Sequence, residues 1–138
     1  MAKVTRIDHI AVLVSDMEAS LRFWQYALGL DLTGLQDVPA EQAQIAFLPA
    51  GNSEVELVRP TSDDSGLARY LEKRGPGMHH ICLEVDDIEG MLEQLKSKGV
   101  ELINETPREG HGGRKYAFIH PRSAFGVMVE LYQYTQQS

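Results

Sequence analysis

The chain of 138 residues has few features that would place it in an oxidising compartment or in a membrane. Its only cysteine is Cys82, so a disulfide cannot form within one chain. An apolar run of bilayer-spanning length is missing, and the first residues do not have the pattern of a secretory leader. We therefore expect a reduced, cytoplasmic protein that has no membrane contact, in which Cys82 is a packing residue.

Basic residues are also scarce. Lysine and arginine total 13 against 20 aspartates and glutamates, which gives a net charge of −7. A nucleic-acid-binding protein needs a basic face, and no such stretch stands out, so we expect no nucleic-acid partner. The single tryptophan, Trp24, falls on a helical stripe with Met17, Leu21 and Leu28. This spacing predicts a core-facing position rather than a ligand-binding aromatic cluster.

Two similar stretches are separated by 71 residues, the offset from His9 to His80. Residues 7–14 and 78–85 both alternate between apolar and polar side chains, as a half-buried β-strand does. Each stretch continues into a helix start, for which Ser15 and its counterpart Asp86 are the predicted N-caps. The chain therefore contains a repeated strand–helix unit.

About three further strands follow the helix in each half. We therefore predict an α+β fold of two tandem βαβββ modules, at about 5–60 and 77–134, in a single domain over 1–138. A short linker helix is expected at about 62–75. One module cannot cover both faces of its sheet, so the two are expected to form one cupped mixed sheet with the helices outside. The clearest later strands are residues 44–48, 54–58, 100–102, 115–120 and 126–132.

Each predicted module has one histidine near its start and one glutamate near its end. These are His9 and Glu56 in the first module, and His80 and Glu130 in the second. All four lie on the strand face opposite the apolar side chains, which favours a metal site over scattered polar positions. Imidazole and carboxylate ligands suit Mn, Fe, Co, Ni or Zn. Four such ligands leave two positions of an octahedral ion open for a chelating substrate.

Short motifs along nearly the whole chain match, in order, the vicinal oxygen chelate superfamily, which includes glyoxalase I. Within this superfamily the chain resembles the methylmalonyl-CoA epimerases. The paired modules are common to the superfamily, whereas the double histidine, the His-Gly-Gly loop and the His-Pro-basic-Ser turn are more specific. The matching stretches are residues 7–12, 47–49, 55–57, 77–81, 111–113, 120–123 and 126–131.

The resemblance implies that His9, Glu56, His80 and Glu130 bind one divalent ion per chain, which could be Co, Mn, Ni, Zn or Mg. Family members have Gln or Glu at the position of Glu56. The implied reaction is the interconversion of (2R)- and (2S)-methylmalonyl-CoA through a metal-stabilised enolate. The resemblance also implies an acyl-CoA substrate and a homodimer.

Inversion at C2 of the substrate requires proton exchange on both faces of that carbon. Glu130 is the first candidate, because a carboxylate that binds a metal keeps one oxygen free near the substrate. Glu41 is the second, since it matches a family carboxylate in the loop before the third strand; the alternative is a solvated loop residue. Another family carboxylate falls near Gln44, which cannot titrate.

Binding of the CoA phosphates is expected to use local groups, for which Arg114, Lys115, Arg122 and Ser123 are the candidates. Two other functions fit the same fold. One is another enzyme of the superfamily, such as a lactoylglutathione lyase-type glyoxalase or a ring-cleaving dioxygenase with three ligands and an iron ion. The other is a metal-free drug-binding protein, which would not need four ligands in repeat register.

Overall fold

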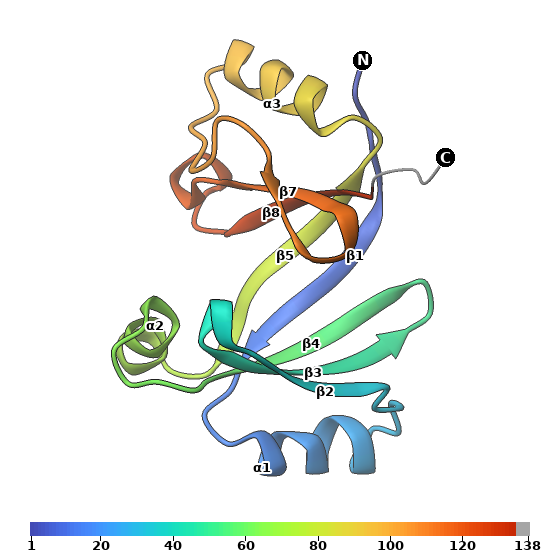
Figure 1. The fold of residues 1–138 in the computed structure, drawn as a ribbon, viewed down its shortest axis with the longest axis vertical. Coiled ribbons are helices and arrows are strands. Elements are labelled where there is room, and N and C mark those ends of the chain that lie inside the picture. Colours follow the sequence, from blue (N-terminus) through green and yellow to red (C-terminus); the bar gives the residue numbers. More distant parts are fainter. Residues whose placement is uncertain (135–138) are drawn as a thin grey trace. The chain divides into compact units, whose positions relative to one another are not determined.

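The structure is a computed structural model that describes residues 1–134 (Figure 1). The chain divides into two compact units. Unit 1 consists of residues 1–8 and 80–138, and unit 2 consists of residues 9–79. The elements in chain order are β1 (Val4–Leu13), α1 (Met17–Leu21), η1 (Arg22–Ala27), β2 (Gly34–Val38), η2 (Pro39–Glu41), β3 (Ala43–Ala50), β4 (Ser53–Pro60), α2 (Gly66–Arg74), β5 (Gly77–Val85), α3 (Ile88–Ser97), β6 (Arg108–Glu109), η3 (His111–Gly113), β7 (Arg114–Ile119), η4 (Pro121–Ala124) and β8 (Val129–Tyr134).

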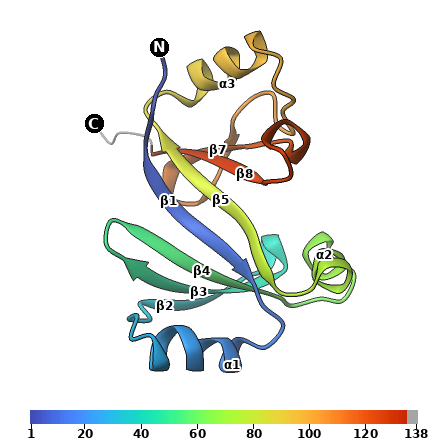
Figure 2. The same ribbon diagram turned by 180° about the vertical axis from the view of Figure 1, so that it is seen from behind.

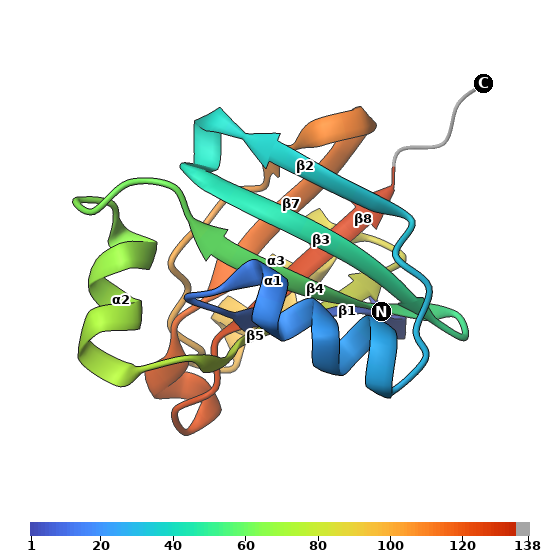
Figure 3. The ribbon, with the colours of Figure 1, turned by 90° about the horizontal axis from the view of Figure 1, so that it is seen from below.

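Unit 2 has the strand order β2-β3-β4-β1, in which β4 and β1 are parallel and the other pairs are antiparallel. Helix α1 covers one face of these strands (Figure 3), and its Met17 is buried there with Ala46, Leu48 and Leu57. The opposite face carries His9, and we call it the His9 face. Helix α2 packs on this face, where its apolar side chains contact a buried cluster of Ala11, Leu13, Ala43, Ile45 and Val58.

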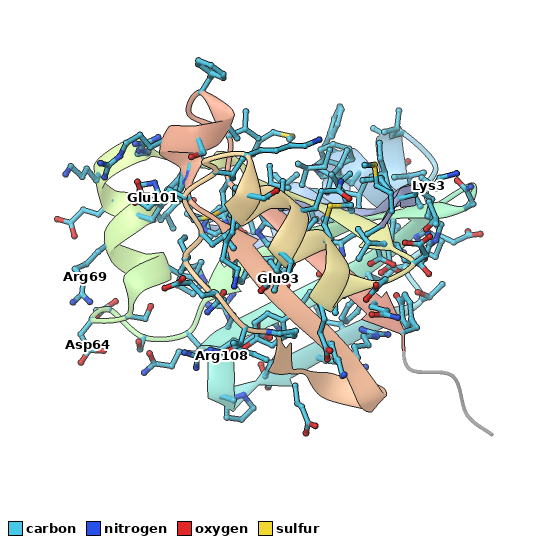
Figure 4. The ribbon with its side chains drawn as sticks, turned by 90° about the horizontal axis from the view of Figure 1, so that it is seen from above. Lys3, Asp64, Arg69, Glu93, Glu101 and Arg108 are labelled. Carbon is cyan, nitrogen blue, oxygen red and sulfur yellow. The ribbon has the colours of Figure 1, made fainter. Side chains whose placement is uncertain are left out.

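Unit 1 has the strand order β5-β8-β7-β6, in which β5 and β8 are parallel and the other pairs are antiparallel. Figure 2 shows β5 beside β8. Helix α3 lies across β7 and β8 in Figure 4, where Glu93 is labelled on it. The α3 side of the strands is apolar, and its buried residues are Val85, Ile88, Met91, Leu92, Ala117, Ile119 and Leu131. The opposite face carries His80, and we call it the His80 face.

The predicted α+β fold, with the strand–helix–three-strand order repeated in both halves, is confirmed. The strand predicted at residues 100–102 is wrong. The Val100 amide still donates to the Leu95 carbonyl of α3, and only Leu102 forms a bridge, with Ile119. The short strand β6 (Arg108–Glu109) pairs with β7 instead.

None of the helices within residues 1–134 combines the length and apolar character needed to cross a membrane.

The helix caps lie one residue later than predicted. The Asp16 side chain accepts a hydrogen bond from the Ala19 amide, and Asp87 accepts one from the Gly90 amide in the same way. Asp86 is used differently, because its carboxylate accepts from the Lys3 amide in unit 1. Serine and aspartate both cap helices well, so local preference could not choose between neighbouring candidates.

The first helix continues as a π-helical turn, η1, and this moves Leu28 out of the predicted core. The Leu28 amide bonds to the carbonyl of Phe23, five residues earlier. A wider turn has more residues per repeat, so the 3.6-residue spacing used for the prediction loses phase. Trp24 packs against the core as predicted, whereas Leu28 is 55% exposed.

We expect Asp16→Ala to lower the free energy of unfolding by about 1 kcal/mol, because the Ala19 amide loses its acceptor. Ser15→Ala should change it by less than about 0.5 kcal/mol, since Ser15 is exposed and is not the cap. Urea unfolding of both variants, followed by circular dichroism, measures the difference. If Ser15→Ala lowered the free energy of unfolding more than Asp16→Ala did, Ser15 rather than Asp16 would be the N-cap.

Candidate active site

Unit 2 places His9 and Glu56 together on the His9 face. The parallel pairing of β1 and β4 sets Glu56 opposite Ala11, two residues from His9 on the same side of the strand. His9 Nδ1 and Glu56 Oε2 are 3.3 Å apart. The histidine is 2% exposed, so its ring position is set by packing. The first predicted His–Glu combination is therefore formed within one unit.

Unit 1 repeats this arrangement with His80 and Glu130. Parallel pairing of β5 and β8 sets Glu130 opposite Cys82, on the His80 face. His80 Nε2 lies 3.1 Å from Glu130 Oε1, and the His80 ring contacts Phe118 edge-on at 5.8 Å between centroids. Glu130 is 5% exposed and Cys82 is buried. Each unit thus contains one imidazole–carboxylate pair in an equivalent place.

Both pairs have the donor types and the spacing that a divalent ion requires. Neighbouring ligands about 2.1 Å from an octahedral ion lie about 3.0 Å apart, close to the separation within each pair. A hydrogen bond between imidazole and carboxylate gives a similar spacing. Burial of a carboxylate is costly unless a cation or donors compensate it, so Glu130 needs such a partner. The residues therefore fit a metal ion as well as a simple ion pair.

The family model described as the glyoxalase/bleomycin resistance protein/dioxygenase superfamily matches residues 8–118, which include His9, Glu56 and His80. The chain belongs to this superfamily. Its mitochondrial methylmalonyl-CoA epimerase relative from Mus musculus is 34% identical over 95% of this chain and 74% of the relative. The ethylmalonyl-CoA/methylmalonyl-CoA epimerase of Cereibacter sphaeroides is also 34% identical, over 94% of this chain and 98% of the relative.

Solved structures of this superfamily agree with the sequence comparison. Methylmalonyl-CoA epimerase in complex with methylmalonyl-CoA and NH4+ is similar with a TM-score of 0.84 and 29% identity, over 96% of both chains. These matches confirm the resemblance to the epimerases of the superfamily. They place the chain among enzymes of the isomerase class.

Glu41 and Gln44 lie in unit 2, at the edge where β3 begins. Glu41 is exposed and ends the short 3₁₀ turn η2, after which Gln42 adopts a left-handed conformation with φ of 51°. Gln44 is half-buried, and its side-chain oxygen accepts a hydrogen bond from Arg59 at 3.1 Å. The structure therefore places Glu41 on a short turn just before β3, and its catalytic role stays a prediction.

Three of the four predicted CoA-binding residues have local partners in unit 1. Lys115 binds Glu89 of α3 at 3.0 Å, and so lies on the α3 side of the strands, away from the His80 face. Ser123 Oγ accepts from the amide of Glu101, a residue labelled in Figure 4. The exposed Arg122 lies 3.8 Å from the Glu101 carboxylate. These contacts assign local structural partners, and the CoA contacts stay predictions.

The fourth residue, Arg114, lies on the His80 face and contacts aromatic rings. Its guanidinium carbon is 5.7 Å from the Tyr132 ring centroid and 5.0 Å from that of Tyr134. Tyr132 and Tyr134 follow Glu130 at every second position of β8, so they share its face. The alternation along this strand is readable from the sequence and could have predicted that Tyr132 and Tyr134 share a face with Glu130.

Sequence patterns also gave no sign of a polar network in unit 1, which is centred on the buried Asp8. The Tyr134 hydroxyl donates to Asp8 Oδ1 at 2.6 Å, and Arg6 binds both Asp8 and Glu84, at 2.7 and 2.5 Å. Burial raises the pKa of Tyr134, and the hydrogen bond to Asp8 and its charge add to this rise. Tyr134 therefore stays neutral at physiological pH and donates to Asp8. The partners are up to 126 residues apart, so sequence spacing could not reveal them.

Proposed function

We propose that the chain interconverts (2R)- and (2S)-methylmalonyl-CoA by proton exchange at C2, with one divalent ion bound by His9, Glu56, His80 and Glu130. The observation that carries this proposal is the repetition of a His–Glu pair with one buried member in each unit of a chain whose relatives include named epimerases. A ring-cleaving dioxygenase needs three ligands, and a drug-binding protein needs none. Neither of these two accounts for both pairs. A lactoylglutathione lyase-type glyoxalase could use both, and the relatives named epimerases, at 34% identity, favour the epimerase over it.

The chain's own residues provide the acid/base chemistry. The C2 hydrogen lies between a thioester and a carboxylate, so its removal leaves a delocalised negative charge. A bound divalent ion supplies Lewis-acid stabilisation of that charge. Glu130, whose Oε1 lies 3.1 Å from His80 Nε2, is proposed to exchange the proton on one face of C2. Glu41 is proposed to exchange the proton on the other face of C2.

The remaining parts of the proposal concern the protein's setting. An acyl-CoA is the proposed substrate class, and a homodimer in the cytoplasm is the proposed form. A net charge of −7 gives the CoA phosphates no long-range attraction, so binding must depend on local cations. The metal is proposed to be Co, Mn, Ni, Zn or Mg, all of which accept imidazole or carboxylate ligands.

The experiment that tests this function is proton NMR of hydrogen exchange at C2 in deuterated water. Each methylmalonyl-CoA epimer is incubated with the protein as purified, after chelation, and after metal is restored. We expect exchange and inversion that are lost on chelation and recovered with metal. Absence of both reactions in a folded, metal-loaded protein would reject the epimerase function, and unchanged rates after verified metal removal would reject the metal's role.

A further inference from the structure

Arg114 is surrounded by aromatic rings rather than by carboxylates. It is half-buried and lies over the rings of Tyr132 and Tyr134, which stand edge-on to each other at 6.2 Å between centroids. Within residues 1–134 its guanidinium forms no salt bridge with a carboxylate. The aromatic rings attract the cation, but they do not neutralise its charge.

Arg108 adds a second cation to the same face. The pairing of β6 with β7 sets it opposite Tyr116, and Tyr116 lies opposite Tyr132 in β8. Residues opposite each other in a sheet share a face, so Arg108 lies on the His80 face across from Tyr116, and Arg114 lies on that face two positions before Tyr116 along β7. Arg108 is exposed and also has no salt bridge among the described residues. Arg108 is labelled in Figure 4.

The tyrosine beneath Arg114 is fixed in position. Its hydroxyl donates to Asp8 at 2.6 Å, and Asp8 is itself bound by Arg6. The ring therefore cannot change rotamer without breaking this partly buried hydrogen bond. The hairpin before β7 is tight as well, because the Gly110 amide donates to the Arg114 carbonyl at 2.7 Å. Arg114 is consequently presented by a preorganised surface rather than by a loose loop.

The distance from this surface to the His80–Glu130 pair suits an extended ligand. Glu130 lies opposite Phe118, and Arg114 precedes Phe118 by four positions on the same strand. At about 3.4 Å per residue, the two ends are about 14 Å apart along the strand. Tyr116 and Tyr132 occupy the positions between them on the same face. A ligand along this face would thus meet carboxylate and imidazole at one end, aromatic rings in the middle and arginines at the other end.

We propose that Arg114 and Arg108, supported by Tyr132 and Tyr134, form a binding subsite for the phosphate groups of the CoA thioester. This inference rests on the proposed function and identifies where unit 1 binds the nucleotide end of the substrate. A guanidinium can bind phosphate through two parallel hydrogen bonds. The aromatic residues provide an uncharged surface for the pantetheine arm.

The test compares two thioesters that share the reacting group. Arg114→Gln should raise KM for methylmalonyl-CoA about tenfold or more, because a charged contact to phosphate is lost. KM for methylmalonyl-pantetheine, which lacks the nucleotide phosphates, should change less than about twofold. Arg22→Gln is the matched control, because Arg22 is exposed in unit 2 and only 3.6 Å from Glu18, and it should affect neither substrate.

The control measurements separate the subsite from general damage. Arg108→Gln should show a smaller effect of the same selectivity, and Arg114→Lys should be intermediate, because it keeps the charge but loses the planar group. Equal changes in KM for both thioesters would overturn the subsite, as would no change for either. If the parent protein turns over neither substrate, the proposed function is rejected, and the phosphate subsite is still untouched by that result. Calorimetric binding of CoA against pantetheine to the parent and Arg114→Gln proteins then tests the subsite alone.

Discussion

A His80→Ala variant should retain its fold but lose its metal ion and nearly all turnover. His80 lies in the His80–Glu130 pair, and its removal leaves Glu130 without an imidazole partner 3.1 Å away. Loss of Lewis-acid stabilisation removes several kcal/mol from the transition state, which corresponds to about 10³-fold or more in rate. His79→Ala is the matched control, because the His79 ring packs against Tyr70 of α2 in unit 2.

Metal content per chain, measured by plasma emission spectrometry, is the decisive measurement for this prediction. The parent and His79→Ala proteins should contain one ion per chain, and His80→Ala much less. His9→Ala should behave as His80→Ala does, because the proposal gives both histidines the same role. Full metal stoichiometry in both the His9→Ala and His80→Ala proteins would contradict the proposed ligand set, and circular dichroism would show whether each variant is folded.

Replacement of Glu41 by Gln should slow inversion by a factor of about 10²–10⁴, the usual contribution of a positioned acid/base group. This change keeps the size of the side chain and removes its ability to accept a proton. Metal binding should remain intact, because Glu41 lies on the η2 turn and is not one of the four proposed ligands. One epimer should still exchange its C2 hydrogen with deuterated water, since Glu130 is unchanged.

Exchange and inversion must therefore be measured separately for each epimer of the Glu41→Gln protein. Fast exchange with slow inversion for one epimer would support two groups on opposite faces of C2. If both rates stay within about twofold of the parent, Glu41 has no catalytic role and another group must supply the second proton. Glu105→Gln is a suitable control, because this exposed residue of unit 1 is outside every proposed site.

Alternation of side chains was sufficient to predict which residues pair within each half. A strand presents every second residue on one face, so His9 and Glu56 could be assigned to a common side, and likewise His80 and Glu130. The structure places each pair within 3.3 Å or less. The repeat between halves then indicated that the two pairs are equivalent. These inferences depend only on local periodicity, which the sequence displays directly.

Features set by tertiary contacts could not be predicted in the same way. The π-helical turn that exposes Leu28 has no sequence signal distinct from that of an ordinary helix. The position of Lys115 depends on an ion pair with Glu89, a residue of another element. The hydrogen bond between Asp8 and Tyr134 joins opposite ends of the described chain. Each outcome follows from packing between distant residues rather than from local preference.

The division of the chain has a consequence for the order in which it folds during synthesis. Unit 2 is an insertion within unit 1, because residues 9–79 lie between the two segments that form unit 1. A growing chain therefore has all of unit 2 available before the second segment of unit 1 is made. Asp8, 8% exposed in the finished structure, meets Tyr134 only after 126 more residues have been added. Domains generally fold as units during translation, so residues 1–8 stay exposed to solvent until the rest of unit 1 has been made. Pairing of the last strand, β8, then completes unit 1.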